Sequence, residues 1–234
     1  MGSGSHLKRL AMPRTWALPR KITTWISRPR SGAHKLEYCM SISTVIRDVL
    51  GYAGNSREVR RILHEKKAKI DGRVVSDPRR GVGLMDVLTL GDVHYRCILD
   101  LNGKLRYRQI APADAEWKVC RIEGKSTIKG GSTQLNLHDG RNIIVDDATE
   151  FNTGDSLKIG LPNQEVLSHL PFQEGSKAYL IGGNHVGAIA NVKEKIVKRS
   201  SMPNEILFDD FGTVAKHVFI VSDETPLPRS EVSQ

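Results

Sequence analysis

Tight-turn dipeptides set between short apolar runs are the feature that most restricts the fold of this 234-residue chain. Asp71-Gly72, Asn102-Gly103 and Asp139-Gly140 each separate two runs in which apolar and polar residues alternate. Such dipeptides favour two-residue β-hairpin turns, because both central positions need positive φ. The sequence therefore predicts hairpins over residues 68–75, 94–110 and 135–145.

Further short apolar runs fill the second half, separated by turn residues at the spacing of small barrels or sandwiches. These runs cover residues 157–159, 166–170, 178–181, 189–197, 206–208 and 218–221. The first half adds a predicted strand over 82–90, closed by Gly91-Asp92, and two short helices. One helix is predicted over Ser41–Leu50, and the second begins after Asn55, where Glu58 completes a capping box. The expected fold class is α+β with several domains.

Charge is divided unevenly along the chain. Residues 1–108 carry 22 basic and 9 acidic side chains, a net charge of +13, whereas residues 109–234 carry 13 and 17, a net charge of −4. A basic half joined to a weakly acidic half indicates a surface for a polyanion. Nucleic acid is the first candidate and an anionic membrane surface is the second. No run approaches the roughly 18 apolar residues of a membrane-spanning helix.

The first 36 residues form a basic arm without Asp or Glu. Pro13, Pro19 and Pro29 interrupt any long helix, which argues against a transit peptide or a membrane-surface helix. A disordered solubilising tail is the alternative, but Trp16 and Trp25 are unusual in such tails. Basic residues interleaved with aromatic ones favour a segment that lies along RNA. The predicted RNA contacts of the arm are His6, Lys8, Arg9, Arg14, Trp16, Arg20, Lys21, Arg28, Arg30, His34 and Lys35.

The helix after Asn55 and the hairpin that follows it resemble the small RNA-binding module named after bacterial small-subunit ribosomal protein four. The resemblance rests on Ser56-Arg57-Glu58, Arg60-Arg61-Ile62-Leu63 and Lys69-Ile70-Asp71-Gly72-Arg73-Val74. It implies that the helix and the hairpin clamp structured RNA, whereas composition alone would equally fit a solvated, charged helix face. The implied RNA contacts are Arg57, Arg60, Arg61, Lys66, Lys67, Lys69, Arg73, Arg79 and Arg80.

Residues 175–192 resemble the KOW motif, the strand–loop–strand of a small SH3-like barrel. Gly175, the run from Ala178 to Gly183, and Gly187-Ala188-Ile189 carry the resemblance. The family usually has an arginine where this chain has Ala188, so the resemblance implies the barrel rather than a phosphate contact from that position. The implied loop residues are Gly182, Gly183, Asn184 and Gly187.

The order of these pieces resembles the small-subunit ribosomal protein four family of the archaeal and eukaryotic type, over roughly residues 6–225. The additional matching stretches are His6–Ala11, Pro13–Trp16, Gly32–Lys35, Val82–Val87 and Phe211–Val214 with Val218–Val221. The resemblance implies a basic arm, an RNA-binding module, a central β domain and a KOW-type barrel with a tail. Their expected ranges are 1–41, 42–92, 93–172 and 173–234.

The same resemblance implies a structural constituent of the small ribosomal subunit, located in the cytoplasm. Its expected partners are small-subunit rRNA and neighbouring ribosomal proteins, and no membrane or small-molecule substrate is expected. The chain length and the short C-terminal tail favour the archaeal type. The open alternative is a non-ribosomal RNA-binding factor, either a KOW-type elongation or regulatory factor or an accessory protein of RNA modification.

No catalytic residue, metal site or cofactor is predicted. Cys39, Cys97 and Cys120 are odd in number and widely spaced, which argues against disulfides and against a structural zinc site. Gly124-Lys125-Ser126 imitates the end of a phosphate-binding loop, but Val119 stands where that loop needs its first glycine. A pseudouridine synthase or a tRNA synthetase would need a large catalytic domain, for which the remaining sequence shows no pattern.

Overall fold

The computed structural model describes residues 5–199 and 202–227, and the chain divides into two compact units. Unit 1 comprises residues 1–98 and 104–116, and unit 2 comprises residues 99–103 and 117–234. By composition, unit 1 has 22 basic and 10 acidic side chains, a net charge of +12, and unit 2 has 13 and 16, a net charge of −3. The uneven charge of the sequence therefore follows the structural division.

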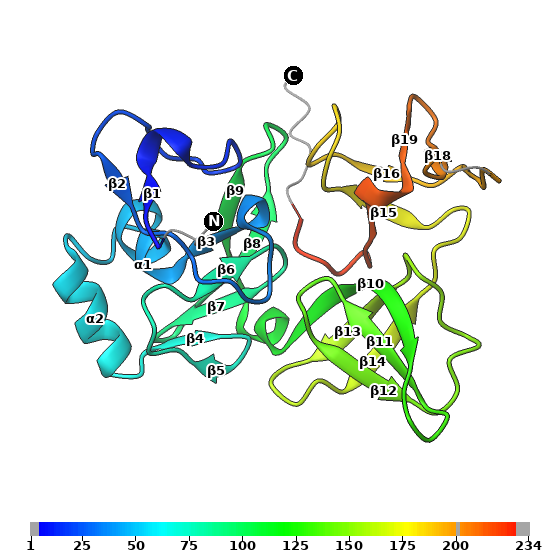
Figure 1. Ribbon diagram of the computed structural model, residues 1–234, viewed down its shortest axis with the longest axis horizontal. Coiled ribbons are helices and arrows are strands. Elements are labelled where there is room, and N and C mark those ends of the chain that lie inside the picture. The colour runs from blue at the N-terminus through cyan, green and yellow to red at the C-terminus, as the bar shows by residue number, and fades with distance from the viewer. Residues whose placement is uncertain (1–4, 200–201, 228–234) are drawn as a thin grey trace. The chain divides into compact units, whose positions relative to one another are not determined.

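Unit 1 is built on a five-stranded sheet (Figure 1). Its strands, in spatial order, are β5 (Arg73–Val74), β4 (Ala68–Ile70), β7 (Val87–Leu90), β8 (Val93–Leu99) and β9 (Leu105–Ile110). Asp71 and Gly72 both have positive φ, 50° and 76°, as the predicted β4–β5 hairpin requires. The hairpins predicted around Asp71-Gly72 and Asn102-Gly103 are thus confirmed, and β7 turns into β8 at Gly91.

The strand predicted over 82–90 is wrong as a single element. Its first part is β6 (Gly81–Gly83), which pairs with β3 (Cys39–Ser41) in a separate two-stranded sheet. Met85 then adopts a positive φ of 67°, and the Asp86 carboxylate accepts a hydrogen bond from the Gly83 N–H at 2.9 Å. This turn redirects the chain before β7, although every residue from Val82 to Leu88 is buried and only Asp86 interrupts the run of non-polar residues.

The helices of unit 1 lie at one end of its sheet (Figure 1). The helix predicted over 41–50 is a single α-helical turn, α1 (Ile42–Thr44), that continues as a π-helical segment, Val45–Val49. The second helix is confirmed as α2 (Ser56–His64), with Asn55 as its N-cap. Among the described residues, no helix has the length and the apolar character needed to cross a membrane.

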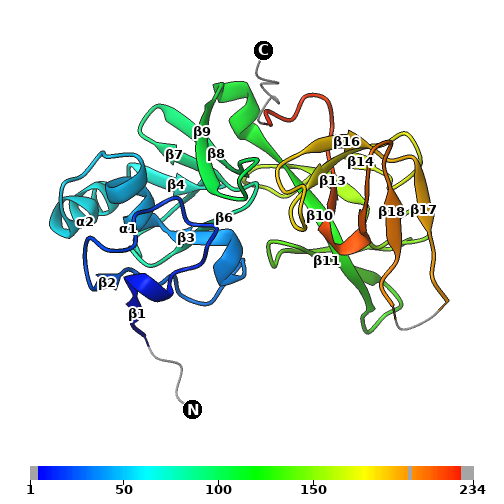
Figure 2. The ribbon, with the colours of Figure 1, turned by 90° about the horizontal axis from the view of Figure 1, so that it is seen from above.

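The arm is packed onto the rest of unit 1 rather than free of it. It contains the short strands β1 (Leu7–Lys8) and β2 (Trp25–Ile26), which pair with each other, and short 3₁₀ turns at Arg9–Ala11 and Leu36–Tyr38. The Leu105 N–H donates to the Thr15 carbonyl at 2.7 Å, and Trp16 forms an isolated bridge with Leu105. These contacts give residues 5–38 a defined path along the unit (Figure 2).

Unit 2 contains a second five-stranded antiparallel sheet. Its order is β12 (Asn142–Val145), β11 (Thr133–Leu137), β10 (Trp117–Thr127), β13 (Ser156–Gly160) and β14 (Val166–Leu170). The central strand β10 is the longest of the described strands and was not predicted, because Lys118 and Arg121 interrupt its apolar pattern although both are buried. The predicted β11–β12 hairpin is confirmed, with Gly140 at a φ of 74°.

The rest of unit 2 forms two three-stranded sheets. One has the order β16 (Ile189–Asn191), β15 (Lys177–Leu180), β20 (Val218–Ile220), and the other has the order β17 (Glu194–Ile196), β18 (Glu205–Leu207), β19 (Gly212–Val214). The single strand predicted over 189–197 is therefore wrong, because its two halves belong to different sheets. Buried Leu180, Val192, Ile206 and Ile220 pack together between the two sheets.

Candidate nucleic-acid interface

Helix α2 presents a basic face because its apolar residues are taken up by the core. Val59 and Leu63 are buried, at 1% and 2% exposure, whereas Arg57, Arg60 and Arg61 are exposed. Residues three or four apart lie on one side of a helix, so this spacing separates an inner apolar stripe from an outer cationic one. The outer stripe is thereby held on a rigid element and faces solvent.

The start of α2 is fixed by side-chain capping. The Asn55 Oδ1 accepts hydrogen bonds from the Arg57 and Glu58 N–H groups, at 2.9 and 3.0 Å. The Glu58 carboxylate accepts in return from the Gly54 N–H at 2.7 Å and from the Asn55 side-chain amide at 2.6 Å. This confirms the predicted cap and satisfies N–H groups that a helix start would leave without partners.

The hairpin after α2 continues the basic surface. Lys69 is exposed between buried Ala68 and Ile70 on β4, and Arg73 is exposed on β5. Lys66, at the turn before β4, has a positive φ of 56° and is also exposed. Lys69 pairs with Val74 and Arg73 with Ile70, so the two cations lie on opposite faces of the hairpin, and both are open to solvent at the edge of the sheet.

One carboxylate neutralises part of this surface. The Glu65 side chain forms ion pairs with Lys67 at 2.6 Å and with Arg61 at 3.1 Å. Hydrogen bonds from Lys67 and then Arg61 lower the pKa of Glu65, so it stays ionised. Within the described part of the chain, no carboxylate pairs with the other module cations that were predicted to contact RNA, whereas Arg47 of the same segment pairs with Asp48. These unpaired cations are Arg57, Arg60, Lys66, Lys69, Arg73, Arg79 and Arg80.

Three residues predicted to contact RNA are instead buried structural groups. Arg9 is 4% exposed and donates to the Pro19 carbonyl at 2.7 Å, and Trp16 is 2% exposed beside Leu105. The His34 side chain is 3% exposed and lies 2.9 Å from the Asp86 carboxylate. These three side chains stabilise the interior of unit 1, because each contacts a group there that is distant from it in the sequence. Arg20 is also used internally, donating to the carbonyls of residues 10 and 13.

The remaining arm residues lie at or near the surface. His6, Lys8, Arg14, Lys21, Arg30 and Lys35 are exposed, and Arg28 is half-buried. Arg30 forms an ion pair with Asp77 at 3.2 Å and donates its N–H to the Arg79 carbonyl at 2.9 Å. The arm is therefore joined to the loop that carries Arg79 and Arg80, and it extends the cationic surface of the module.

The glycines predicted in the KOW loop are explained by packing within unit 2. A Cβ atom on Gly182 would lie 2.1 Å from the His217 ring, and one on Gly187 would lie 2.4 Å from the Asp100 carbonyl oxygen. Gly183 and Gly187 also have positive φ, 84° and 81°. Asn184 is exposed, so it is the residue of this predicted set whose side chain faces solvent.

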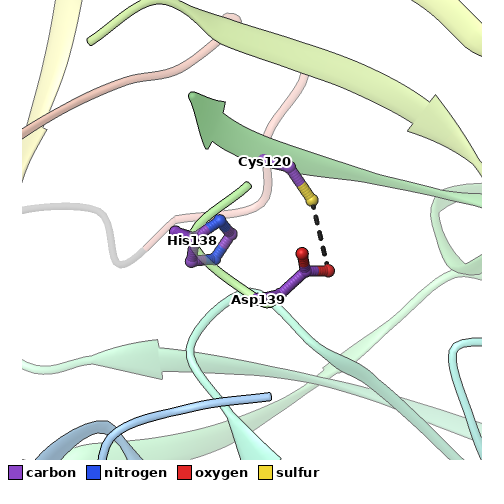
Figure 3. Close-up of side chains that lie close together, drawn as sticks. All are labelled: Cys120, His138 and Asp139. Atoms are coloured by element: carbon purple, nitrogen blue, oxygen red, sulfur yellow. Dashed lines mark hydrogen bonds between the residues drawn. The ribbon is translucent and has the colours of Figure 1, made fainter. Parts of the chain in front are cut away.

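A buried polar cluster in unit 2 was not predicted (Figure 3). Its centre is the Asp139 carboxylate, which lies 2.5 Å from Lys118 Nζ and 3.0 Å from Arg141 Nε. The Cys120 thiol points at the same carboxylate, with 3.6 Å between Sγ and Oδ2. His138 lies beside them and accepts a hydrogen bond from the Arg121 N–H.

Cys120, His138 and Asp139 bring their donor atoms within 4.8 Å of one another, a spacing suitable for a metal ion. Two cationic side chains already neutralise Asp139, however, and a divalent cation would be repelled by them at this distance. The cluster is therefore best described as a buried ion pair that holds β10 to the β11–β12 turn. The only sequence signal for it was a charged residue within the apolar run of β10.

Fold and surface together define a β-rich protein of several sheets whose positive charge is concentrated on one of two units. Comparison with known proteins shows to which family the chain is related. The family model described as "Ribosomal family S4e" matches residues 92–166, and the RS4NT (NUC023) domain model matches residues 1–37. The chain is 42% identical over 240 residues to the small ribosomal subunit protein eS4 of Methanocaldococcus jannaschii, covering 97% of each chain.

A second relative, the eS4 protein of Methanocella arvoryzae, is 37% identical over 229 residues, which cover 95% of this chain and 96% of the relative. Among solved structures, the crystal structure of the 30S ribosomal protein S4e from Thermoplasma acidophilum superimposes with a TM-score of 0.70. That structure is 29% identical and covers 80% of this chain and 96% of its own. The chain belongs to ribosomal family S4e.

Proposed function

We propose that this chain is a structural constituent of the small ribosomal subunit, where it binds and stabilises small-subunit rRNA. Nearly full-length relatives named as small ribosomal subunit proteins support the assignment. The observation that carries the mode of binding is the row of exposed cations without carboxylate partners on α2, the β4–β5 hairpin and the loop after it. The role is structural rather than catalytic, and the place of action is the cytoplasmic ribosome.

The surface suits RNA for three physical reasons. Guanidinium groups bind two phosphate oxygens at once, and arginine predominates among the exposed cations of α2. The cations lie on a helix and a hairpin whose backbones are fixed, so little order must be gained on binding. The deep major groove of A-form RNA excludes side chains, so the protein recognises the shape and the phosphates of the RNA more than its sequence.

The proposed organisation keeps the four segments expected from the sequence: arm 1–41, module 42–92, central β domain 93–172 and KOW-type barrel 173–234. The first strands of the central segment, β8 and β9, extend the sheet that holds the module's β4, β5 and β7. The contacts assigned to rRNA are those of the exposed arm and module residues, without Arg9, Trp16 and His34. Neighbouring ribosomal proteins are the proposed partners of the surface that rRNA leaves free.

Sedimentation of a cell lysate tests this function. The native protein should migrate with the small ribosomal subunit through a gradient at moderate salt and stay with it after a high-salt wash. As a control, purified small subunits from cells depleted of the protein should bind it again at one copy each. Migration as a free protein of 26.0 kDa under both conditions would contradict the proposal.

A further inference from the structure

A pocket of about 300 Å³ lies in unit 1, where the arm, the two helices and the loop before β6 come together. Its walls come from β2, α1, the π-helical segment, α2 and residues 78–79, and Figure 1 shows β2 beside these helices. The volume falls at the lower end of the range for small-molecule sites, about 300–1,000 Å³. The pocket is therefore large enough for one small aromatic group with a polar substituent.

Trp25 supplies an aromatic surface to this pocket. Neighbouring residues of a strand point in opposite directions. In β2, Ile26 is therefore buried, at 5% exposure, whereas the Trp25 side chain points outward and is 55% exposed. A large aromatic side chain left half in solvent loses apolar burial that the fold could have used. Such a ring is suited to stack on a flat ligand, and stacking on a nucleobase does not depend on the base's identity.

Two arginines of the pocket have no carboxylate to neutralise them. Arg60 comes from α2 and Arg79 from the loop, and within the described residues neither side chain forms an ion pair. Arg47, the third arginine of the pocket, differs because Asp48 holds it through two hydrogen bonds of 2.8 and 3.1 Å. The pocket therefore combines an aromatic face with two cations available to a phosphate.

The walls are fixed before any ligand arrives. The Ser43 N–H donates to the Pro78 carbonyl at 3.1 Å, and the Arg30 N–H donates to the Arg79 carbonyl at 2.9 Å. The Arg47 guanidinium also donates to the Ser56 hydroxyl at 3.1 Å, which joins the π-helical segment to the start of α2. A preformed site binds with a smaller entropic cost than one that must be ordered.

We propose that this pocket binds one unstacked nucleotide of the RNA held by unit 1, with the base against Trp25 and a phosphate on Arg60 and Arg79. The inference rests on the proposed RNA-binding function and adds to it a requirement for an unpaired residue in the RNA. Bases within a duplex cover each other's faces, so only a nucleotide in a loop, bulge or end can stack on the indole.

Tryptophan fluorescence of the full-length protein tests the stacking directly. The chain has three tryptophans, and Trp16 and Trp117 are 2% and 8% exposed, so a ligand that stacks in the pocket acts on Trp25. Hexauridylate, an unstructured single strand, should quench the emission of the wild-type protein, and Trp25→Phe should abolish that quenching. Equal quenching in both proteins would overturn the proposal.

Binding to a small-subunit rRNA transcript tests the contribution to affinity. Trp25→Ala should weaken binding by about 5- to 150-fold, the range expected for loss of one stacked base, and Trp25→Phe should restore most of it. Ile22→Ala is the matched control, because Ile22 is an arm residue of similar exposure, 67%, outside the pocket. An unchanged affinity of Trp25→Ala would overturn the proposal.

Two further comparisons distinguish an RNA site from a site for free nucleotides, and the pocket inference from the proposed function. Uridine monophosphate should quench only at far higher concentration than hexauridylate; equal potency would identify a site for free nucleotides and overturn the assignment to RNA.

If wild-type protein binds rRNA and Trp25→Ala binds equally well, the pocket inference fails while the proposed function stands. If wild-type protein fails to bind rRNA, the proposed function fails, and the hexauridylate measurement still decides whether the pocket stacks a base.

Discussion

At the scale of single residues, unit 2 contains charged side chains that are buried and depend on one another for compensation. Lys118 lies in the centre of its sheet at 0% exposure, where an unpaired ammonium group would be very costly. Its partner Asp139 is 3% exposed as a whole residue and also pairs with Arg141. Whatever the pair contributes relative to an apolar core, removing only one member leaves a buried charge without compensation.

Asp139→Asn should therefore destabilise the protein by about 3–5 kcal/mol, measured by urea denaturation. The double variant Lys118→Met with Asp139→Asn should recover part of that loss, because no unpaired lysine then remains in the sheet. Asp210→Asn, at an exposed position, is the control and should change stability by less than about 0.5 kcal/mol. A loss of similar size in the control and in Asp139→Asn would refute the role of the pair.

The cysteines give a second prediction at the scale of single residues. Cys39, Cys97 and Cys120 are free and buried, and burial, followed by the nearby charge of Asp86, raises the pKa of the Cys39 thiol to about 12. Because the thiolate is the reactive form, the folded protein should release almost no chromophore from a disulfide reagent at pH 8. Addition of denaturant should expose three reactive thiols; fast reaction of the folded protein would contradict the buried placement.

At the scale of elements, the turn before β15, which holds Gly175, and the loop between β15 and β16, which holds Gly187, depend on glycine for two separable reasons. Gly175 and Gly187 have nearly equal φ, 82° and 81°, but a Cβ on Gly175 would meet nothing within 4 Å. A Cβ on Gly187 would lie 2.4 Å from a backbone oxygen. The two positions therefore share the conformational strain of a non-glycine residue and differ in the steric clash.

Gly187→Ala should lower the unfolding free energy by clearly more than Gly175→Ala, which should cost about 1 kcal/mol. Denaturant midpoints of the two variants measure the difference directly. Equal midpoints would mean that the backbone of residue 100 moves aside without cost. Binding to rRNA, measured below the unfolding transition, should stay unchanged in both variants, since the role argued for Gly187 is packing.

The outer stripe of α2 should act through phosphates. Replacing Arg57 by alanine should weaken rRNA binding and reduce the slope of log K against log salt by about 1, because one fewer counterion is released. Lys129→Ala, an exposed cation of unit 2, is the matched control and should leave the slope unchanged. Filter binding between low and moderate salt measures both; an unchanged slope for Arg57→Ala would remove that residue from the interface.

What the sequence predicted at this scale depended on local signals. The Asp71-Gly72 and Asp139-Gly140 hairpins and the Asn55 cap were predicted correctly, because the residues that determine them are adjacent in the chain. Strand β10 was missed because Lys118 looks like a surface residue until its partner, Asp139, is placed beside it. The arm residues Arg9 and Trp16 were assigned to RNA for the same reason, since the groups that bury them are separated from them in sequence.

At the scale of the whole molecule, the division of charge between the units predicts that a polyanion binds to unit 1. Two triple variants lower the net charge equally, from +9 to +6, and differ only in the unit they change. In the first variant, replacing Lys66, Lys69 and Arg73 by alanine should reduce the salt slope of rRNA binding by about 2–3. In the second variant, replacing Lys129, Lys193 and Arg199 by alanine should leave the salt slope nearly unchanged. Equal effects would show that total charge, rather than its placement, governs binding.

The short segment Leu99–Gly103 belongs to unit 2, although the residues on both sides of it belong to unit 1. It is held there by buried Tyr179, whose hydroxyl group accepts from the Leu99 N–H and donates to the Leu99 carbonyl, each at 2.7 Å. These partners are 80 residues apart. At a synthesis rate of about 5–20 residues per second, the segment leaves the ribosome some 4–16 seconds before its tyrosine. During that interval the arginine-rich sequence of α2 has already emerged, whereas the tyrosine that fixes residues 99–103 in unit 2 has not.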